Sequence, residues 1–162
     1  MEIRKAKLEQ LREIQKVFDI GRNFMRQNGN MNQWINGYPQ DEVLIDDIKS
    51  GNLYVCEEND EIVGVFAFII GKDPTYSYIE GGSWLDDGSY GTVHRIASSG
   101  KVRGVAKTCF DFCKTKINNV RCDTHHDNVF MQKKLEENGF KKCGVIYISD
   151  GSPRVAYNFV KE

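Results

Sequence analysis

The first third of the chain carries its apolar residues at helical spacing. From Leu8 to about Gln27 they recur three or four positions apart, at Leu8, Leu11, Ile14, Val17, Phe18 and Phe24 or Met25. Asn28-Gly29-Asn30 ends this predicted helix. The stretch from Met31 to Pro39 lacks the period and reads as a loop, and a shorter helix follows from Asp41 to about Lys49. Two helices are therefore predicted before the first strong strand signal.

Strand patterns come next. Leu53–Glu57 and Glu61–Ile70 flank the turn Glu58-Asn59-Asp60, an arrangement typical of a β-hairpin. The second of these runs is the longest apolar run in the chain and reads as a buried strand. Tyr76–Trp84 is a possible strand that two glycines interrupt, and Gly91–Ala97 is predicted to be another strand.

The remainder alternates between helical and strand patterns. The predicted elements are a helix over Lys101–Ile117, a strand over Val120–Thr124, a helix over Asn128–Asn138, and strands over Phe140–Ile148 and Pro153–Val160. No repeat or linker interrupts them, so we expect one domain, residues 1–162. The order predicts an α/β fold with a mixed sheet and helices on both faces, and the strand-to-helix crossing at residues 92–116 is where we expect a ligand.

Composition excludes several classes of protein. The 22 Lys and Arg residues balance 23 Asp and Glu residues, which argues against a nucleic-acid binder with a wholly basic surface. No apolar run approaches the roughly 18 residues of a membrane span, so no membrane partner is expected. The first residues, Met1–Lys5, lack the apolar stretch of a secretory signal. Five cysteines without a Cys-x-x-Cys pair favour a cytoplasmic protein with reduced thiols.

A glycine-bearing loop joins the strand around His94–Ala97 to the next helix. A helix N-terminus points backbone N–H groups and a positive dipole end toward one place, which favours anions. Gly104 and Ala106 would let an anion approach the backbone, and Lys101 and Arg103 add positive charge. The plain alternative is a tight turn with solvated basic residues. The spacing does not fit the P-loop pattern, which disfavours a nucleotide triphosphatase.

Two motifs together resemble a known superfamily, the GCN5-related N-acetyltransferases (GNAT). Lys101-x-x-Gly104-x-Ala106 is similar to the superfamily's loop Arg/Gln-x-x-Gly-x-Gly/Ala, with lysine in place of the first residue. Asn128 and Gly139-Phe140 fall in the register of the asparagine after its fifth strand and of the Gly-Phe that ends the next helix. The predicted order of elements matches over nearly the whole chain. The resemblance implies a twisted, mostly antiparallel mixed sheet of six to seven strands.

The resemblance also implies acetyl-CoA as co-substrate, and no metal. The strand from Arg95 to Ser98 would splay from its neighbour, and its backbone at Ile96, Ala97 and Ser98 would hold pantetheine, with one N–H stabilising the oxyanion. The pyrophosphate would be held by the loop residues Lys101, Val102, Arg103, Gly104, Val105 and Ala106. Asn128 would contact pantetheine. Its alternative role is to N-cap the following helix, which Asp127 could also do.

Direct acetyl transfer to an amine calls for a base, and an acid can assist the departing thiolate. For the base we consider His94, Glu80 and His125, and of these His94 and Glu80 are the predicted catalytic residues. Their plain alternatives are a histidine bonded to a backbone carbonyl and a solvated strand residue. Many members of the superfamily have an acidic tyrosine seven residues after the asparagine, where this chain has Leu135. Tyr147 or Cys143 could substitute in principle, but ordinary strand packing is the favoured interpretation of both. Solvent could also protonate the thiolate.

Two further groups of residues are weighed here. His125 and His126, with Asp123 and Asp127, suggest metal ligands, but adjacent histidines on a short turn point apart, so we predict no metal site. Aromatic residues in or near loops could line an acceptor pocket or simply pack under the loops: Trp34, Tyr38, Tyr76, Tyr78, Trp84 and Tyr90. Of these, Trp34, Tyr78 and Trp84 are our predicted acceptor-binding residues.

Three functions remain open from sequence. The first is an acetyl-CoA-dependent N-acetyltransferase that acts on a primary amine, expected to be a small molecule, in a ternary complex. The second is a non-catalytic acyl-CoA-binding or regulatory module on the same fold, which Leu135 favours. The third is an interaction domain whose glycine loop binds nothing. A homodimer is an expectation from the superfamily alone.

Overall fold

A seven-stranded sheet forms the centre of the computed structural model, which describes residues 1–162. Its strands lie in the order β1-β2-β3-β4-β5-β7-β6, and their bounds are β1 Glu2–Lys5, β2 Leu53–Glu58, β3 Glu61–Ile70, β4 Gly91–Ser98, β5 Asn119–Thr124, β6 Lys141–Tyr147 and β7 Pro153–Val160. Every neighbouring pair is antiparallel except β4 and β5. The predicted mixed, mostly antiparallel sheet is confirmed.

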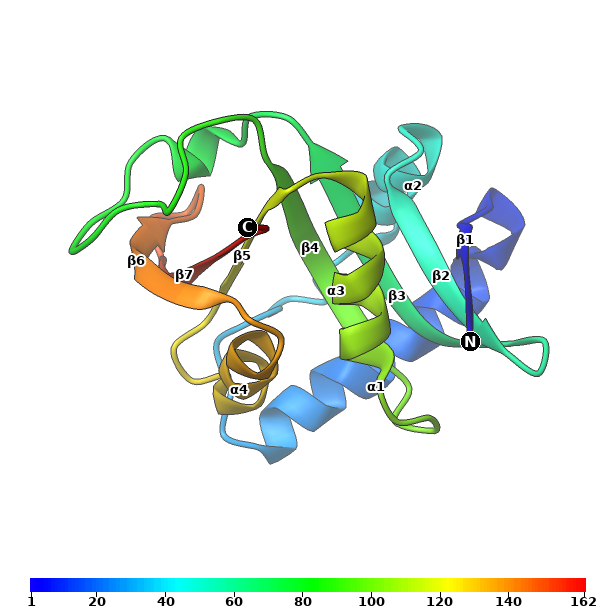
Figure 1. Ribbon diagram of the computed structural model, residues 1–162. Coiled ribbons are helices and arrows are strands. Elements are labelled where there is room, and N and C mark those ends of the chain that lie inside the picture. The colour runs from blue at the N-terminus through cyan, green and yellow to red at the C-terminus, as the bar shows by residue number, and fades with distance from the viewer.

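Four α-helices cover the two faces of this sheet (Figure 1). Their bounds are α1 Leu11–Gln27, α2 Asp41–Lys49, α3 Val105–Lys116 and α4 Val129–Glu137. α1 and α2 pack on one face, and α3 and α4 pack on the other. Helices on both faces were predicted, and this is confirmed.

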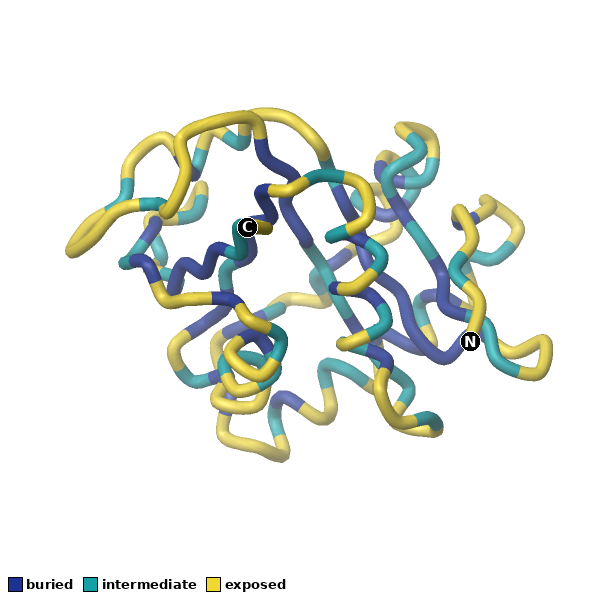
Figure 2. The backbone as a smooth tube through the Cα atoms, in the orientation of Figure 1, coloured by how far each residue is buried: buried dark blue, intermediate teal, exposed yellow.

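The core lies between the sheet and these helices. On one face, Phe18 and Leu44 pack against Val55 and Val65, all fully buried. On the other, α3 contributes Phe110 to a cluster that includes strands β3, β4, β5 and β7. The central strands are mostly buried, whereas the helices alternate buried and exposed positions (Figure 2). Burial on both faces explains why β3 is continuously apolar rather than alternating.

Strands β4 and β5 stop pairing partway along their length. Their pairing ends at Val93 and Cys122, although β4 continues to Ser98 and β5 stays paired with β7 as far as Thr124. β4 also bulges here, because three steps along β4 oppose two along β3, and Arg95 lies in the left-handed region at φ 48°. The splay predicted from the resemblance is therefore present, and it leaves one edge of β4 without a strand partner.

The structure corrects the predicted secondary structure at four places. The strand β1 was missed because four mostly exposed residues are too short to show a period. The predicted strand Tyr76–Trp84 was wrong. A short 3-10 helix, η2, at Pro74–Tyr76 begins that stretch, and one isolated bridge joins Glu80 to Val145. Gly82 is needed there because a Cβ would lie 1.9 Å from the Cys143 carbonyl oxygen.

The predicted helix over Lys101–Ile117 begins later than expected, at Val105. Gly104 precedes it with φ 82°, a conformation that glycine adopts without strain, so residues 101–104 form the loop itself. Before α1, residues Leu8–Gln10 form a 3-10 turn, η1, rather than the start of the α-helix.

The structure adds two facts about the chemistry of the chain. None of the helices combines the length and the apolar character that a bilayer crossing requires. All five cysteines are buried free thiols, and the sulfur atoms of Cys56 and Cys109 lie 3.6 Å apart.

Candidate functional site

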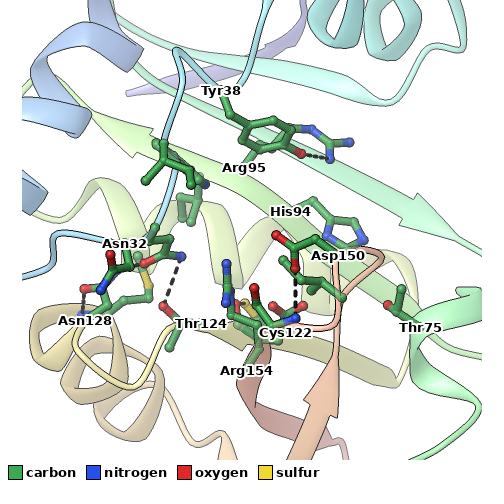
Figure 3. Close-up of a pocket in the computed structure, with 18 of the residues that line it drawn as sticks. Asn32, Tyr38, Thr75, His94, Arg95, Cys122, Thr124, Asn128, Asp150 and Arg154 are labelled. Carbon is green, nitrogen blue, oxygen red and sulfur yellow. Dashed lines mark hydrogen bonds between the residues drawn. The ribbon is translucent and has the colours of Figure 1, made fainter.

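A cavity opens where β4 and β5 diverge. Its volume is about 730 Å³, a size typical of small-molecule sites. Its walls are formed by the loop between α1 and α2, the turn after β3, the diverging ends of β4 and of β5, the start of α4, and the β6–β7 turn (Figure 3). Of the sequence-predicted site residues, this cavity brings together Trp34, His94, Ile96 and Asn128.

His94 forms the acid–base group of the cavity with Asp73. Its Nε2 lies 3.0 Å from an Asp73 carboxylate oxygen, and both side chains are about one-fifth exposed. The hydrogen bond from His94 is the largest influence on Asp73, and it lowers the pKa of the carboxyl. Burial acts to raise this pKa, but the bonds from His94 and Thr75 outweigh it and lower the pKa to about 2. An ionised carboxylate only accepts hydrogen bonds, so Nε2 carries the proton. Nδ1 makes no hydrogen bond within the protein, so its lone pair, when the ring carries no second proton, can take a proton from a substrate.

The Asp73 carboxylate makes folding stability depend on pH. Its pKa is lowered from an ordinary value of 3.8 to about 2, so its contribution is present above about pH 4 and lost as pH falls toward 2. Allowing for partial exposure, we expect about 1–2 kcal/mol. Urea unfolding should show Asp73→Asn less stable than wild type by this amount at pH 6, with the gap narrowing as pH falls from about 4 toward 2. A gap that is independent of pH would contradict this assignment.

Arg95 lies at the bulge of β4, and its side chain is bonded to Asp47 of helix α2. Its Nε and one Nη donate to the two Asp47 carboxylate oxygens at 2.7 and 2.8 Å, and the other Nη donates to the Tyr38 hydroxyl at 3.1 Å. Burial acts to lower the pKa of Arg95, but the bonds from Asp47 and Tyr38 outweigh it and raise the pKa. The pair holds the bulge and the Tyr38 ring beside the cavity (Figure 3).

Asn128 is the N-cap of α4, the alternative role that the sequence left open. Its Oδ1 accepts the Met131 backbone N–H at 3.0 Å, and Asp127 does not cap the helix. The Asn128 Nδ2 donates to Gln33 Oε1 at 3.0 Å, and this amide in turn reaches Thr124. The buried amides tie the loop that carries Trp34 to the end of β5. The Trp34 ring itself packs edge-on against Phe18, with centroids 5.4 Å apart.

The loop before α3 offers unpaired backbone donors. The backbone N–H groups from Val102 to Lys107 donate to no acceptor within the protein. The Gly104 carbonyl, the first to accept a bond from the helix, accepts from Thr108. A Cβ on Gly104 would meet nothing within 4 Å, so the backbone is open to a ligand. Lys101 forms an exposed ion pair with Glu61. An amide cradle of this kind fits a phosphate group.

The other predicted cofactor residues lie in or beside this loop, and they do not line the cavity. Ala97 and Val105 are buried in the core on opposite faces of the sheet, and Ala106 and Val102 pack at its margin. Ser98 pairs with Gly64 at the end of β4. Arg103 is exposed.

Three predicted site residues lie outside the cavity. Glu80 is exposed and accepts a hydrogen bond from Tyr147. Tyr78 is 62% exposed and stacks on the same tyrosine. Trp84 packs in a small core between Tyr76 and the Arg121 guanidinium. The structure does not bring these three side chains to His94.

The position of the family's tyrosine is closed to the cavity. Leu135 is fully buried in the core beneath α4. Burial raises the pKa of the Cys143 thiol, and the hydrogen bond with Glu80 raises that of Tyr147. Neither lines the cavity. No side chain replaces the tyrosine at its own position, so protonation of the thiolate is left to groups that line the cavity or to solvent.

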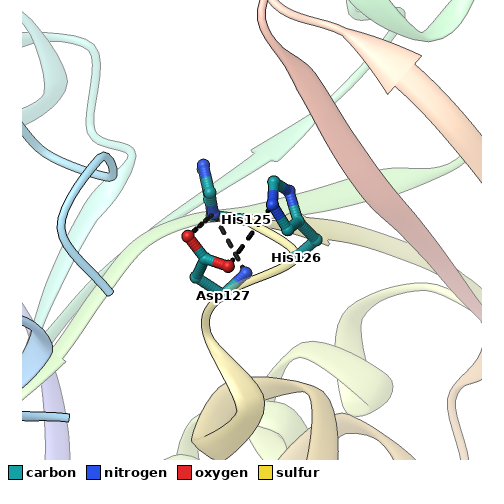
Figure 4. A group of neighbouring side chains, drawn as sticks. All are labelled: His125, His126 and Asp127. Carbon is teal, nitrogen blue, oxygen red and sulfur yellow. Dashed lines mark hydrogen bonds and ion pairs between the residues drawn. The ribbon is translucent and has the colours of Figure 1, made fainter. Parts of the chain in front are cut away.

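His125, His126 and Asp127 cluster at the turn before α4 (Figure 4). Their donor atoms lie within 4.8 Å of one another. The prediction that the two histidines point apart was wrong, because their imidazole rings stack with centroids 4.3 Å apart. His125 Nδ1 already accepts the Asp127 backbone N–H at 3.0 Å. These contacts account for the cluster as part of the turn. That the protein uses no metal stays a prediction.

Several residues of the cavity were missed as site residues from sequence. Besides Asp73 and Arg95, these are Asp123, which accepts a 2.6 Å hydrogen bond from the buried Tyr76 hydroxyl, and Asp150 and Arg154 from the β6–β7 turn and β7. Asp73 heads a turn in which it accepts from Thr75, and the Asp-Pro-Thr sequence is the one local signal that could have indicated it. The others carry no local signal.

Comparisons with known proteins bear on the family. A GNAT-family acetyltransferase of known structure from Streptococcus agalactiae 2603 is 34% identical, with a TM-score of 0.91 over 99% of this chain and 95% of that one. A GNAT-family acetyltransferase from Listeria monocytogenes 4b F2365 shares 16% identity and a TM-score of 0.70 over 98% and 94% of the two chains.

The fold is also shared with a protein of different chemistry. The GNAT-like decarboxylase GphF, solved in complex with isobutyryl-CoA, has a TM-score of 0.70 at 11% identity over 99% of both chains. No family model and no curated protein matches this sequence. With a relative 34% identical over nearly its whole length, and with the splayed strands and amide loop in place, the chain belongs to the GNAT acetyltransferase family.

Proposed function

We propose that this protein transfers the acetyl group of acetyl-CoA to a primary amine of a small molecule, by direct attack in a ternary complex. The observation that carries the proposal is the His94–Asp73 pair, which faces a small-molecule cavity at the place where β4 leaves β5. The amide loop at the N-terminus of α3 supports it as a pyrophosphate site. Family membership makes an acyl-CoA the expected donor.

The chain's own groups supply the steps of the reaction. His94 takes a proton from the acceptor ammonium, and the neutral nitrogen attacks the thioester carbonyl carbon. A backbone N–H on the unpaired edge of β4 stabilises the oxyanion, because no strand pairs with that edge beyond Val93. The attacking nitrogen then gives its second proton to solvent as the C–S bond breaks, and the thiolate takes a proton from solvent. The products are the N-acetylated amine and CoA.

The amide loop is tested by Gly104→Trp, whose side chain would cover the open backbone. We expect acetyl-CoA affinity to fall about 10–100-fold, the loss of one or two charge-assisted hydrogen bonds, measured by isothermal titration calorimetry. Gly29→Trp is the matched control. It has φ 81°, nothing within 4 Å of its Cβ, and a position at the far end of α1. Unchanged affinity in a folded Gly104→Trp protein would refute the loop assignment.

One observation favours a second function, a non-catalytic acyl-CoA-binding module. Leu135 leaves the family's tyrosine position buried and without a proton donor. Saturable binding of acetyl-CoA, stronger than that of ATP, together with no CoA release across a broad panel of amines, would support this module and exclude the enzyme.

A further inference from the structure

Arg154 lines the cavity and forms no ion pair with a carboxylate. His94 is bonded to Asp73, and Arg95 is bonded to both oxygens of Asp47. Arg154 makes one hydrogen bond, from an Nη to the Pro153 carbonyl oxygen at 2.9 Å, and no carboxylate lies within ion-pair distance of it. Four of its five guanidinium N–H donors are therefore free.

The free donors of Arg154 face the cavity. Val155, the next residue of β7, points to the α3 and α4 side of the sheet, so Arg154 points to the opposite side, where the cavity lies. Figure 3 shows the guanidinium rising from β7 between Thr124 and Asp150. The side chain is half-buried, and burial lowers the pKa of Arg154 while Asp123 and Asp150 partly restore it.

Two carboxylates flank the guanidinium without bonding to it. Asp123 uses one oxygen to accept from Tyr76, and Asp150 uses one to accept from the Ser152 backbone N–H at 2.8 Å. Each keeps its second oxygen available. The cavity thus presents a negative, a positive and a negative group in one region.

This arrangement distinguishes between kinds of acceptor. A simple amine or polyamine would leave the half-buried guanidinium with flanking carboxylates but no anion bonded to it. A phosphorylated amine would bring nearly two negative charges beside Asp123 and Asp150, which repel it. A small molecule that carries a single carboxylate near an ammonium group complements all three charges, and a planar carboxylate matches the guanidinium in bidentate fashion.

Resting on the proposed function, we infer that the acceptor is an amino-acid-type compound, an amine that bears a carboxylate, and that Arg154 binds this carboxylate while His94 accepts the proton of the reacting amine. Arg154 is then the residue that determines acceptor specificity. The cavity, about 730 Å³ in volume, accommodates a compound of this size.

The experiment measures CoA release in matched sets: each common α-amino acid, its carboxamide and its decarboxylated amine. For the amino acids that are used, we expect wild-type kcat/KM to exceed that of the carboxylate-free partners at least tenfold. Arg154→Gln should raise KM about 10–100-fold for the acid, since charge-assisted hydrogen bonds are lost, and leave the KM of the partner amines within about twofold. Arg154→Lys should retain part of the preference, because it keeps the charge and loses the fork.

Lys142→Gln is the matched control, an exposed cation on the neighbouring strand β6, and it should leave the preference unchanged. Equal kcat/KM within the matched sets of the wild type would overturn the inference, and this comparison needs no variant to fold. A preference that survives in Arg154→Gln would overturn the role of Arg154. Transfer to carboxylate-free amines alone would leave the proposed function standing, whereas no transfer to any amine would end both.

Discussion

Replacing His94 by alanine is expected to lower kcat for acetyl transfer by about 10²–10⁴-fold, the usual contribution of a positioned general base. The side chain lines the cavity, and its Nε2 is bonded to a carboxylate whose pKa is about 2. This bond fixes the tautomer and leaves Nδ1 as the basic nitrogen. The measurement is steady-state CoA release with saturating acetyl-CoA, as a function of pH.

The pH profile separates a base from a structural residue. In wild type, the limb of kcat/KM that rises with pH reports the loss of a proton from the base, and His94→Ala should lose that limb. His126→Ala is the control, because His126 is exposed and lies outside the cavity. Acetyl-CoA affinity should be the same in all three proteins. If His94→Ala keeps both its rate and the rising limb, the base is another group.

Replacing Asp47 by alanine should destabilise the protein by about 3–5 kcal/mol, because it leaves the buried Arg95 guanidinium without its counter-ion. Asp47 is 7% exposed, and it bonds Arg95 through both carboxylate oxygens. The same pair anchors the β4 bulge, where Arg95 has φ 48°. Urea unfolding followed by circular dichroism gives the free energy of unfolding.

Two further proteins make this test specific. Asp46→Ala changes an exposed neighbour on the same helix, and its effect should stay within about 0.5 kcal/mol. The double variant Asp47→Leu/Arg95→Met removes both charges, and it should recover much of the lost stability, because the cost comes from the unpaired charge. A loss below 1 kcal/mol in Asp47→Ala would show that water solvates Arg95 and that the pair does not hold the bulge.

Local patterns were sufficient for most of the elements. The helices over residues 11–27 and 41–49 and the β2–β3 hairpin follow from periodicity and turn residues, which act within a few positions of the chain. The loop before α3 was predictable for the same reason, since Gly104 sits at the helix boundary in a conformation that glycine favours. Local reasoning failed at β1, whose four residues are too few, and at Tyr76–Trp84, where contacts with β6 replace a strand.

The cavity could not be predicted from local patterns, because its residues come together only when the sheet forms. Arg95 and Asp47 lie 48 positions apart, and Asn128 and Gln33 lie 95 apart. Arg154 faces the cavity because β7 lies beside β5, and a shift of one residue in register would turn it to the other face. The sequence by itself determined the elements, the glycine loop before α3 and His94 as a candidate base, since each depends on neighbouring residues. Only the tertiary structure decided which charges share one cavity, because strand order and register set those contacts.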